Sequence, residues 1–431
     1  MRYTICLLLC LVCLLCSAGS LLAADIVITT PGRSAIPIAQ PTFIAIGAAD
    51  AQVERTIDEV LTQDLELTGM FEFVERNAFL DDASRLALTT IEVNFPQWKL
   101  LGADLLLKGA YTLKDGQVEL KLRLFDVNRR RLLTGHNYKG SRDDVRRMVH
   151  RFVDQMLETL TGTRGAFDAN IAFISDASGH KELYLAEFDG HNIRRLTDHR
   201  NLVLNPDFSP QGREIIFTSY RKDNPDLYRR SIFNATEARI SAREGLNIAG
   251  RYSPDGREVA VTLSQDGNSE LYLLGVDGKI HKRLTNAWGI DVDPSWSPLG
   301  DKIAFISNRH GNPHVFIIDL LTGVVERLTR AGKYNATPAW SPDGEWILFT
   351  RLEQGGFDIY RIRPDGSAEE QLTAGAGNKE HPRWSPDGRF VIYSDDVLGE
   401  KRLYIMRADG TGAREISPLP GRCSHPAWAV R

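Results

Sequence analysis

A repeated Ser-Pro-Xaa-Gly sequence constrains the fold of this chain more than any other feature. The tetrapeptide recurs every 44 residues, starting at Ser209, Ser253, Ser297, Ser341 and Ser385. An aromatic residue precedes each copy, and the same aromatic column continues one period later at Trp428. A fixed period of this length is typical of solenoids, propellers and other repeat architectures.

Two further columns, that is, sets of similar residues at equivalent positions of the repeat, recur with the same 44-residue spacing. One of them is aromatic and comprises Tyr184, Tyr228, Tyr272, Phe316, Tyr360 and Tyr404. The other pairs an apolar residue with a hydroxyl-bearing one, from Leu196-Thr197 to Ile416-Ser417. Three columns in one register exclude a chance pattern, so the repeat decides the architecture.

The signals inside one period are those of short strands and tight turns. Runs such as Ile347–Thr350 are rich in β-branched and aromatic residues. Ser341-Pro342-Asp343-Gly344 has the residue preferences of a type I turn, and Asp365-Gly366 marks a second reversal. Four antiparallel strands in each period predict a propeller blade.

Six copies of the inner strand predict six blades. We expect the last inner strand, Pro426–Val430, to complete the blade that residues 170–200 begin, because this closure hides two sheet edges. The predicted fold class is therefore α+β, with an N-terminal mixed α/β domain followed by an all-β six-bladed β-propeller.

The region before the repeats has a different character. Gln52–Leu67 has one apolar helical face, Leu105–Leu113 and Val118–Val127 indicate a hairpin, and Ser141 can cap a helix through Leu160. We divide the chain into a leader, residues 1–24, an N-terminal α/β domain, residues 25–163, and a propeller, residues 164–431.

The leader has the features of a secretory signal peptide. Arg2 precedes the apolar run Ile5–Cys16, and small residues up to Ala24 follow it. The run is short for a bilayer, which needs about 20 apolar residues, so an uncleaved anchor is the weaker alternative. A lipoprotein is weaker still, because Gly or Ala precedes none of the cysteines in the run. We expect cleavage near Ala24 and a mature chain without a membrane span.

Cysteine content and charge exclude some classes of protein. Four of the five cysteines lie in the leader, so Cys423 has no internal disulfide partner after cleavage. The chain carries 52 Lys and Arg against 56 Asp and Glu, with no long basic run, which argues against nucleic-acid binding. We expect a monomer without a nucleic-acid partner.

The sequence offers little for catalysis. It contains no Gly-Xaa-Ser-Xaa-Gly elbow of a serine hydrolase. His310 and His314 are separated by Gly311-Asn312-Pro313, which disfavours a helical zinc pair, and calcium loops and phosphate-binding glycine loops do not occur. We therefore expect no enzyme activity, no cofactor and no metal site, although acidic side chains in a propeller channel leave a trapped cation open.

One set of positions varies from blade to blade. Two residues before each inner-strand aromatic stands a proline, except in the second blade, where Gly250 replaces it. The residues immediately before that position are Asn205, Ala249, Asp293, Thr337, His381 and His425. Because inner strands converge on the axis, these six residues form a ring at one mouth of the channel. The ring is either a solvated rim or a site for a partner's loop, since a near-symmetric scaffold leaves such positions free for recognition.

The Trp-Ser-Pro-Asp-Gly repeats, the Leu-Thr column, the leader and the junction from Leu160 to Phe167 together resemble the TolB family of the bacterial Tol–Pal envelope system. The resemblance covers essentially the whole chain after the leader. It implies a non-enzymatic periplasmic adaptor that binds the peptidoglycan-associated lipoprotein Pal and the inner-membrane-anchored protein TolA. It also implies a role in outer-membrane integrity and in outer-membrane invagination during cell division, with other envelope proteins as further partners.

The resemblance implies two binding regions. The Pal interface corresponds to the ring mouth, where the candidate residues are Leu246, Asn247, Ala249, Val292, Asp293, Thr337, His381 and His425. The TolA contact corresponds to the mature N-terminal segment that begins at Asp25. In that segment Ile26, Val27 and Ile28 suit the addition of a strand to a partner sheet. Gly250 departs from the family pattern, in which proline follows the ring residue.

A second class of function stays open. A secreted propeller that binds or cleaves a glycan or peptide would carry paired carboxylates at acid–base separation in its channel. Among the six ring residues Asp293 is the only carboxylate, and this favours the adaptor.

Overall fold

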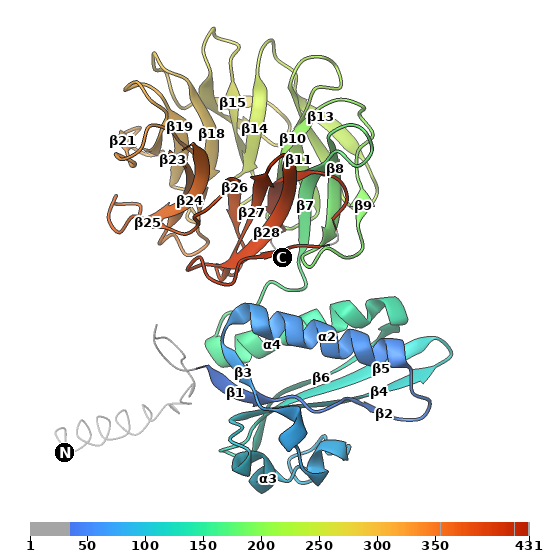
Figure 1. The fold of residues 1–431 in the computed structure, drawn as a ribbon. Coiled ribbons are helices and arrows are strands. Elements are labelled where there is room, and N and C mark those ends of the chain that lie inside the picture. Colours follow the sequence, from blue (N-terminus) through green and yellow to red (C-terminus); the bar gives the residue numbers. More distant parts are fainter. Residues whose placement is uncertain (1–34, 354, 418, 430–431) are drawn as a thin grey trace, which may run out of the picture.

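The chain folds into an N-terminal α/β part and a β-propeller (Figure 1). The computed structural model describes residues 35–353, 355–417 and 419–429. In the N-terminal part, two long helices lie on the face of the sheet that is directed toward the propeller, and a short helix lies on the opposite side (Figure 1). The predicted fold class is confirmed.

The N-terminal sheet has the order β3-β1-β4-β5-β6, with β2 paired to β4. Its strands are β1 (Ile36–Ala39), β2 (Ile44–Ala45), β3 (Phe71–Phe73), β4 (Leu105–Lys114), β5 (Gln117–Asp126) and β6 (Arg131–Ser141). The helices are α2 (Ala51–Thr68), α3 (Phe95–Leu100) and α4 (Val145–Thr161), with single 3₁₀ turns η1 (Arg76–Ala78), η2 (Asp81–Ser84) and η3 (Arg142–Asp144).

The two long helices begin and end at recognisable caps. The Asp50 carboxylate accepts hydrogen bonds from two backbone N–H groups of the first turn of α2, and Gly69 ends that helix in a left-handed conformation. Ser141 and Asp144 form a capping box before α4, as the sequence predicts. The predicted helices and hairpin are thus present. Strand β6 was not predicted, because its residues are half-buried or exposed and show no clear apolar alternation.

Each propeller blade is a four-stranded antiparallel sheet, and six blades close the ring. The inner strands are β10 (Val203–Phe208), β14 (Asn247–Tyr252), β18 (Asp291–Trp296), β22 (Asn335–Trp340), β26 (Asn378–Trp384) and β30 (Cys423–Trp428). The second strands are β11 (Glu214–Ser219), β15 (Glu258–Leu263), β19 (Lys302–Ser307), β23 (Ile347–Glu353), β27 (Phe390–Val397) and β7 (Asn170–Ser175). We number the blades one to six in this order.

The two outer strands of each blade complete the sheets. The third strands are β12 (Asp226–Ser231), β16 (Glu270–Gly275), β20 (His314–Asp319), β24 (Gly356–Ile362), β28 (Glu400–Arg407) and β8 (Glu182–Glu187). The outermost strands are β13 (Glu237–Ser241), β17 (Ile280–Arg283), β21 (Val325–Arg327), β25 (Glu370–Gln371), β29 (Arg414–Glu415) and β9 (Arg194–Arg195).

The sixth blade joins the two ends of the propeller chain in the order β30-β7-β8-β9, as the sequence predicts. Its inner strand is Cys423–Trp428 rather than the expected Pro426–Val430. Val430 and Arg431, the last two residues of the chain, lie outside the described part. The strand begins earlier because it includes the residues on both sides of a β-bulge, which a simple alternation of polarity does not show.

The repeat columns hold each blade together. The Ser341 hydroxyl accepts the Trp346 N–H at 2.9 Å and so closes the turn between inner and second strands. The Thr285 hydroxyl accepts the Leu271 N–H at 2.9 Å and donates to the buried Glu270 carboxylate at 2.6 Å. The serine of all five Ser-Pro turns accepts a backbone N–H in this way, and so do four threonines of the Leu-Thr column, Thr197, Thr285, Thr329 and Thr373. The columns therefore serve the scaffold.

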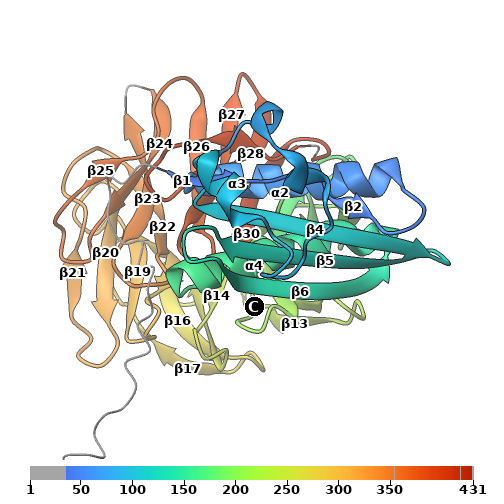
Figure 2. The ribbon, with the colours of Figure 1, turned by 90° about the horizontal axis from the view of Figure 1, so that it is seen from below.

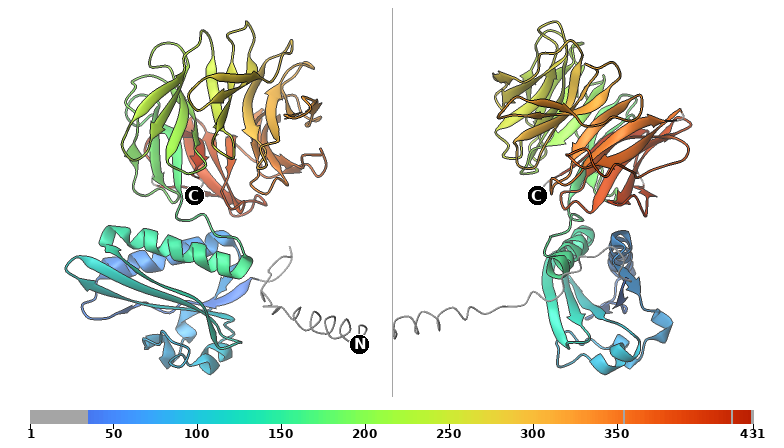
Figure 3. Two further views of the ribbon diagram at one scale, coloured as in Figure 1. Left: turned by 180° about the vertical axis from the view of Figure 1, so that it is seen from behind. Right: turned by 90° about the vertical axis from the view of Figure 1, so that its left-hand side faces the viewer.

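The two parts of the chain are in direct contact. Arg407 on β28 donates to the Glu66 and Leu67 carbonyls at the end of α2, and Arg389 donates to the Thr163 carbonyl after α4. A single stretch of chain connects α4 to β7 (Figure 3). Seen from the side of the N-terminal part, the third and fourth blades extend beyond it (Figure 2). We propose the domain division between residues 163 and 164, within that connection.

Candidate functional site

The six ring residues share an unusual backbone conformation. All have φ between 48° and 56°, the left-handed region that few residues other than glycine adopt. Each lies where the ladder between inner and second strand shifts register, for example between Val292 and Ser295. The ring is therefore a set of six equivalent β-bulges, which turn one residue of each inner strand out of the ladder.

The bulge explains the residue that follows each ring position. This residue has no partner in the ladder, so a proline costs no hydrogen bond there. In the second blade, a Cβ at Gly250 would lie 2.8 Å from Cδ1 of Leu227 in the neighbouring blade. The departure from the family pattern thus has a packing reason: Leu227 leaves no room for a side chain.

Buried threonines fix two of the bulges from the preceding blade. Thr218 Oγ1 accepts the N–H of Ala249, and Thr262 Oγ1 accepts the N–H of Asp293, both at 3.3 Å. Both threonines are fully buried. Sequence reasoning missed them, although their 44-residue spacing in the second strand was available as a signal.

Asp293 brings a carboxylate to the mouth. Its Oδ1 lies 3.6 Å from Nη2 of Arg251, and its side chain retains 15% of its full exposure. Arg251 comes from the neighbouring inner strand, two residues beyond the ring position Ala249. The pair links the second and third blades and leaves the carboxylate within reach of a partner.

His381 and His425 form a stacked pair on the fifth and sixth blades, with ring centroids 3.8 Å apart. Burial, followed by the neighbouring Lys401, lowers the pKa of His425 to about 3. Burial, followed by the proximity of the second imidazole, His425, holds the pKa of His381 well below its usual range. Both imidazoles are therefore neutral at pH 7. Nδ1 of His381 is buried without a hydrogen-bond partner among the described residues.

The remaining predicted residues differ in accessibility. Leu246, Val292 and Thr337 are half-buried at the mouth, whereas Ala249 is almost fully buried. Asn247 is fully buried, and its amide holds the preceding loop through the Arg243 N–H and the Arg243 and Gly245 carbonyls. The amide group of Asn247 therefore forms its hydrogen bonds within this loop. The predicted N-terminal residues Asp25, Ile26, Val27 and Ile28 lie outside the described residues.

Trp288 is a further candidate binding residue, which sequence reasoning did not identify. It lies in the loop that leads into β18 and Asp293, and its side chain is fully exposed. The Asn268 amide donates to the carbonyls on both sides of it, Ala287 at 2.8 Å and Gly289 at 2.6 Å. The loop thus presents a large aromatic surface from a fixed backbone beside the ring. Its position in the loop just before the ring residue Asp293 was the sequence signal that could have identified it.

One group of potential metal ligands comes together within the described part of the chain: His150, Glu187 and Asp189. It lies between the two domains, away from the ring. Asp64 and Arg146 already form ion pairs with its members, His150 and Asp189 respectively. A cation there would compete with an existing guanidinium, so this group does not fit a metal.

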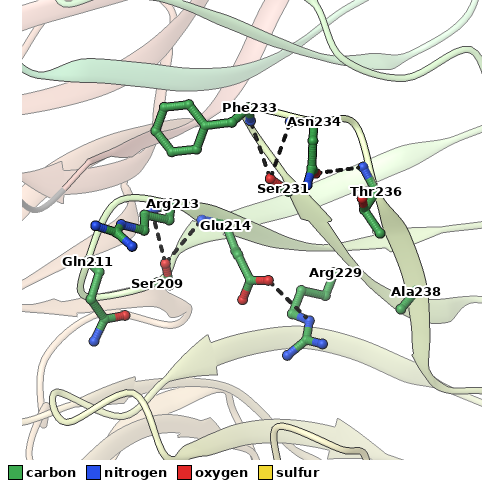
Figure 4. A pocket seen from close by; sticks show the side chains of 10 residues that line it. All are labelled: Ser209, Gln211, Arg213, Glu214, Arg229, Ser231, Phe233, Asn234, Thr236 and Ala238. Carbon is green, nitrogen blue, oxygen red and sulfur yellow. Dashed lines mark hydrogen bonds and ion pairs between the residues drawn. The ribbon is translucent and has the colours of Figure 1, made fainter.

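A separate hollow of about 550 Å³ lies on the outside of the first blade (Figure 4). Its polar groups are engaged with one another: the Ser209 hydroxyl accepts the Glu214 N–H, and Glu214 lies 3.6 Å from Arg229. The Ser231 hydroxyl accepts the Phe233 N–H in the turn between β12 and β13. The hollow is thus formed by turns whose hydroxyls are occupied, and we assign it no ligand.

Among the described residues, none of the helices has the length and apolar character of a membrane-spanning segment.

Comparison with known proteins gives consistent matches over both parts. Residues 157–431 match the family described as the TolB beta propeller domain, and residues 24–133 match the TolB amino-terminal domain. The Tol-Pal system protein TolB of Syntrophotalea carbinolica is 55% identical over 207 residues, 48% of each chain. That of Desulfosudis oleivorans is 40% identical over 225 residues, 51% of each chain. The matched chain thus spans about half the length of these curated relatives.

A solved structure extends the match to nearly the whole chain. The crystal structure of TolB from Acinetobacter baumannii has a TM-score of 0.79 and 26% sequence identity, and the alignment covers 92% of this chain and 97% of that one. The propeller match covers more than half of the sequence and coincides with the six observed blades. By its propeller, its N-terminal domain and its overall structure, the chain belongs to the TolB family.

Proposed function

We propose that this protein is a non-enzymatic adaptor of the Tol–Pal system in the periplasm. It binds the lipoprotein Pal through the ring mouth of the propeller and TolA through the N-terminal segment that begins at Asp25. In this role it supports outer-membrane integrity and invagination of the outer membrane during cell division. Membership of the TolB family and the leader sequence support this assignment.

The observation that carries the proposal is the ring of six bulges. A closed propeller with six-fold repeats would present six identical positions, yet the side chains at the bulges all differ between adjacent blades except for the histidine pair. Left-handed backbone at alanine and threonine is strained, and strain of this kind persists where the surrounding structure holds it for a purpose. Recognition by a partner's loop is such a purpose.

The chemistry of the mouth suits a protein partner. It combines one carboxylate at Asp293, two neutral imidazoles, and apolar surface from Leu246, Val292 and the adjacent Trp288. Protein interfaces are enriched in aromatic residues at their centre and place a few polar groups that fix orientation. Asp293 faces Arg251 rather than a second carboxylate, and this arrangement does not favour glycan hydrolysis.

The start of the described chain suggests how the two binding regions communicate. Ile36 donates to the Met70 carbonyl, and the neighbouring Gly69 lies against the Arg407 side chain of the propeller. The described chain therefore begins beside the domain interface. We propose that the N-terminal segment that begins at Asp25 occupies mutually exclusive states that are coupled to occupancy of the ring mouth by Pal.

Calorimetric titration with purified, lipid-free Pal and with the soluble part of TolA tests the proposal. We expect Pal to bind the full mature chain, and deletion of residues 25–33 to abolish TolA binding while Pal binding persists. Coupling requires that TolA changes the Pal affinity and that Pal changes the TolA affinity by the same factor. Failure to bind Pal, with binding of a peptidoglycan-derived saccharide instead, would replace the adaptor by the glycan-binding alternative. Equal Pal affinities with and without TolA would remove the coupling.

A further inference from the structure

The channel has a second mouth at the opposite end of the inner strands. Each inner strand ends there in its aromatic residue, just before the Ser-Pro turn. A pocket of about 340 Å³ lies at this mouth. Its wall contains the complete aromatic column: Phe208, Tyr252, Trp296, Trp340, Trp384 and Trp428. The prolines of the five Ser-Pro turns complete the rim.

The floor of this pocket is charged. It is formed by the residue before each aromatic: Asp207, Arg251, Ser295, Ala339, Arg383 and Ala427. Arg251 belongs to the second blade and Arg383 to the fifth, so the two guanidinium groups approach from opposite sides of the six-bladed ring. An anion on the axis is therefore positioned to interact with both.

The two guanidinium groups of the floor differ in their partners. Arg251 faces Asp293, but Arg383 forms no ion pair among the described residues, and its guanidinium donates to its neighbour's carbonyl, that of Pro382, at 3.0 Å. Burial and the charge of Arg251 lower the pKa of Arg383 to about 10, so it remains a cation at pH 7. Asp207 is the other charged residue of the floor; burial raises the pKa of its carboxyl, and its Oδ2 accepts the Tyr252 N–H at 3.0 Å.

The aromatic walls are held in fixed orientations. The indole N–H of Trp384 donates to the Ala339 carbonyl, and that of Trp296 donates to the Arg251 carbonyl, both at 3.1 Å and both to the preceding blade. The indole N–H of Trp340 donates to Gly344 in its own turn. The rings are thus pinned at their polar edges while they line the pocket. Large pinned rings suit a flat apolar group, and a ligand there gives up little side-chain entropy from the protein.

We propose that this pocket binds a small organic carboxylate that carries a planar ring. The carboxylate pairs with Arg383, assisted by Arg251, and the ring lies against the tryptophan walls. Guanidinium groups match carboxylates in both charge and geometry. The pocket lies at the other end of the inner strands from the proposed Pal mouth, and its Arg251 also faces Asp293 of that mouth.

Benzoate and its uncharged analogue benzamide test this inference in the full mature protein. Tryptophan fluorescence is the readout, because Trp296, Trp340, Trp384 and Trp428 line the pocket. We expect saturable quenching by benzoate with an affinity about tenfold or more above that of benzamide, since the amide lacks the charge. Acetate, which lacks the ring, should compete only weakly.

Two variants separate the proposed contact from general charge effects. Arg383→Gln should remove the preference for benzoate, and Arg383→Lys should restore part of it. Arg257→Gln removes an exposed guanidinium from the turn of the second blade, outside the pocket, and should leave benzoate binding unchanged. Equal affinity for benzoate and benzamide, unaltered benzoate binding by Arg383→Gln, or absence of saturable quenching would each overturn the inference. Circular dichroism verifies that both Arg383 variants are folded.

Discussion

At the scale of single residues, His150 joins the two parts of the chain through buried charge. Its Nδ1 lies 2.7 Å from Oδ2 of Asp64 on α2, and its Nε2 lies 3.2 Å from Oδ2 of Asp189 in the sixth blade. Burial opposes protonation, but the two carboxylates prevail and raise the pKa of His150 to about 10. Arg146 pairs with the same Asp189 carboxylate. The imidazolium is therefore part of the domain interface at neutral pH.

His150→Gln should destabilise the protein in a pH-dependent manner. The folded-state pKa is raised above the ordinary value of 6.5, so the stabilisation is complete below pH 6.5 and is lost as the pH rises toward about 10. Removal of one partner from a buried ion pair costs about 3 kcal/mol, and we expect a loss of that order near pH 6. Calorimetric unfolding of both proteins at several pH values measures it.

The matched control for this prediction is His281→Gln. His281 faces Glu258 at 2.8 Å, but both side chains are substantially exposed, so its removal should change the unfolding temperature little. A difference between wild type and His150→Gln that stays constant from pH 6 to pH 10 would contradict the assigned charge state of His150.

Gly250 is a second residue whose identity the packing dictates. Its backbone φ is not in the left-handed region, so a Gly250→Ala substitution adds only the clash with Leu227. We expect a loss of about 1–3 kcal/mol in the free energy of unfolding, as is usual for overpacking. Urea unfolding of Gly250→Ala, Leu227→Ala and the double variant measures the coupling between the two positions. Additive effects would show that the two side chains do not compete for space.

At the scale of elements, the loops between blades determine what the ring mouth presents. The loop before β18 is fixed by Asn268 and by the side-chain amide oxygen Oδ1 of Asn308, which accepts the Ile290 N–H at 2.8 Å. Gly289 is required beside it, because a Cβ there would lie 2.4 Å from that same Asn308 oxygen. A rigid loop exposes Trp288 without a loss of entropy on binding, which is a property of residues that dominate protein interfaces.

Trp288→Ala should weaken Pal binding by about tenfold or more without a change in stability, because an exposed side chain contributes little to folding. Calorimetric titration with Pal gives the affinity, and thermal unfolding gives the stability. Leu299→Ala is the control: this residue is also strongly exposed, but it lies in the Ser-Pro turn at the other end of the third blade. An equal effect of the two substitutions would exclude the loop before β18 from the interface.

At the scale of the whole molecule, the periodic features were predictable and the aperiodic ones were not. The 44-residue columns indicate six blades and their closure because each column reports the same local requirement six times. The ring was located for the same reason. Its left-handed backbone, by contrast, arises from a two-residue bulge in the ladder, and a mixture of Asn, Ala, Asp, Thr and His gives no single signal for that conformation.

Contacts between distant segments also escaped prediction. The ion pairs of His150 join α2, α4 and the sixth blade, and no spacing along the chain brings these residues together. The pairing of Arg251 with Asp293 and the placement of Arg383 opposite it depend on closure of the ring. Sequence reasoning found the scaffold and the six equivalent positions of the ring, whereas the charge arrangement required the assembled propeller.

The most direct test of the central claim, that Pal binds at the ring mouth, is Asp293→Arg. A positive charge at this position would face Arg251 and disrupt the charge pattern of the mouth, so we expect Pal affinity to fall by about thirtyfold or more. Glu326→Arg makes the same charge change on an exposed position of β21 in the same blade and should leave the affinity unchanged. Calorimetric titration of lipid-free Pal into both variants and the wild type measures the three affinities. Loss of binding only in Asp293→Arg is the predicted result, and wild-type affinity in Asp293→Arg would contradict the account.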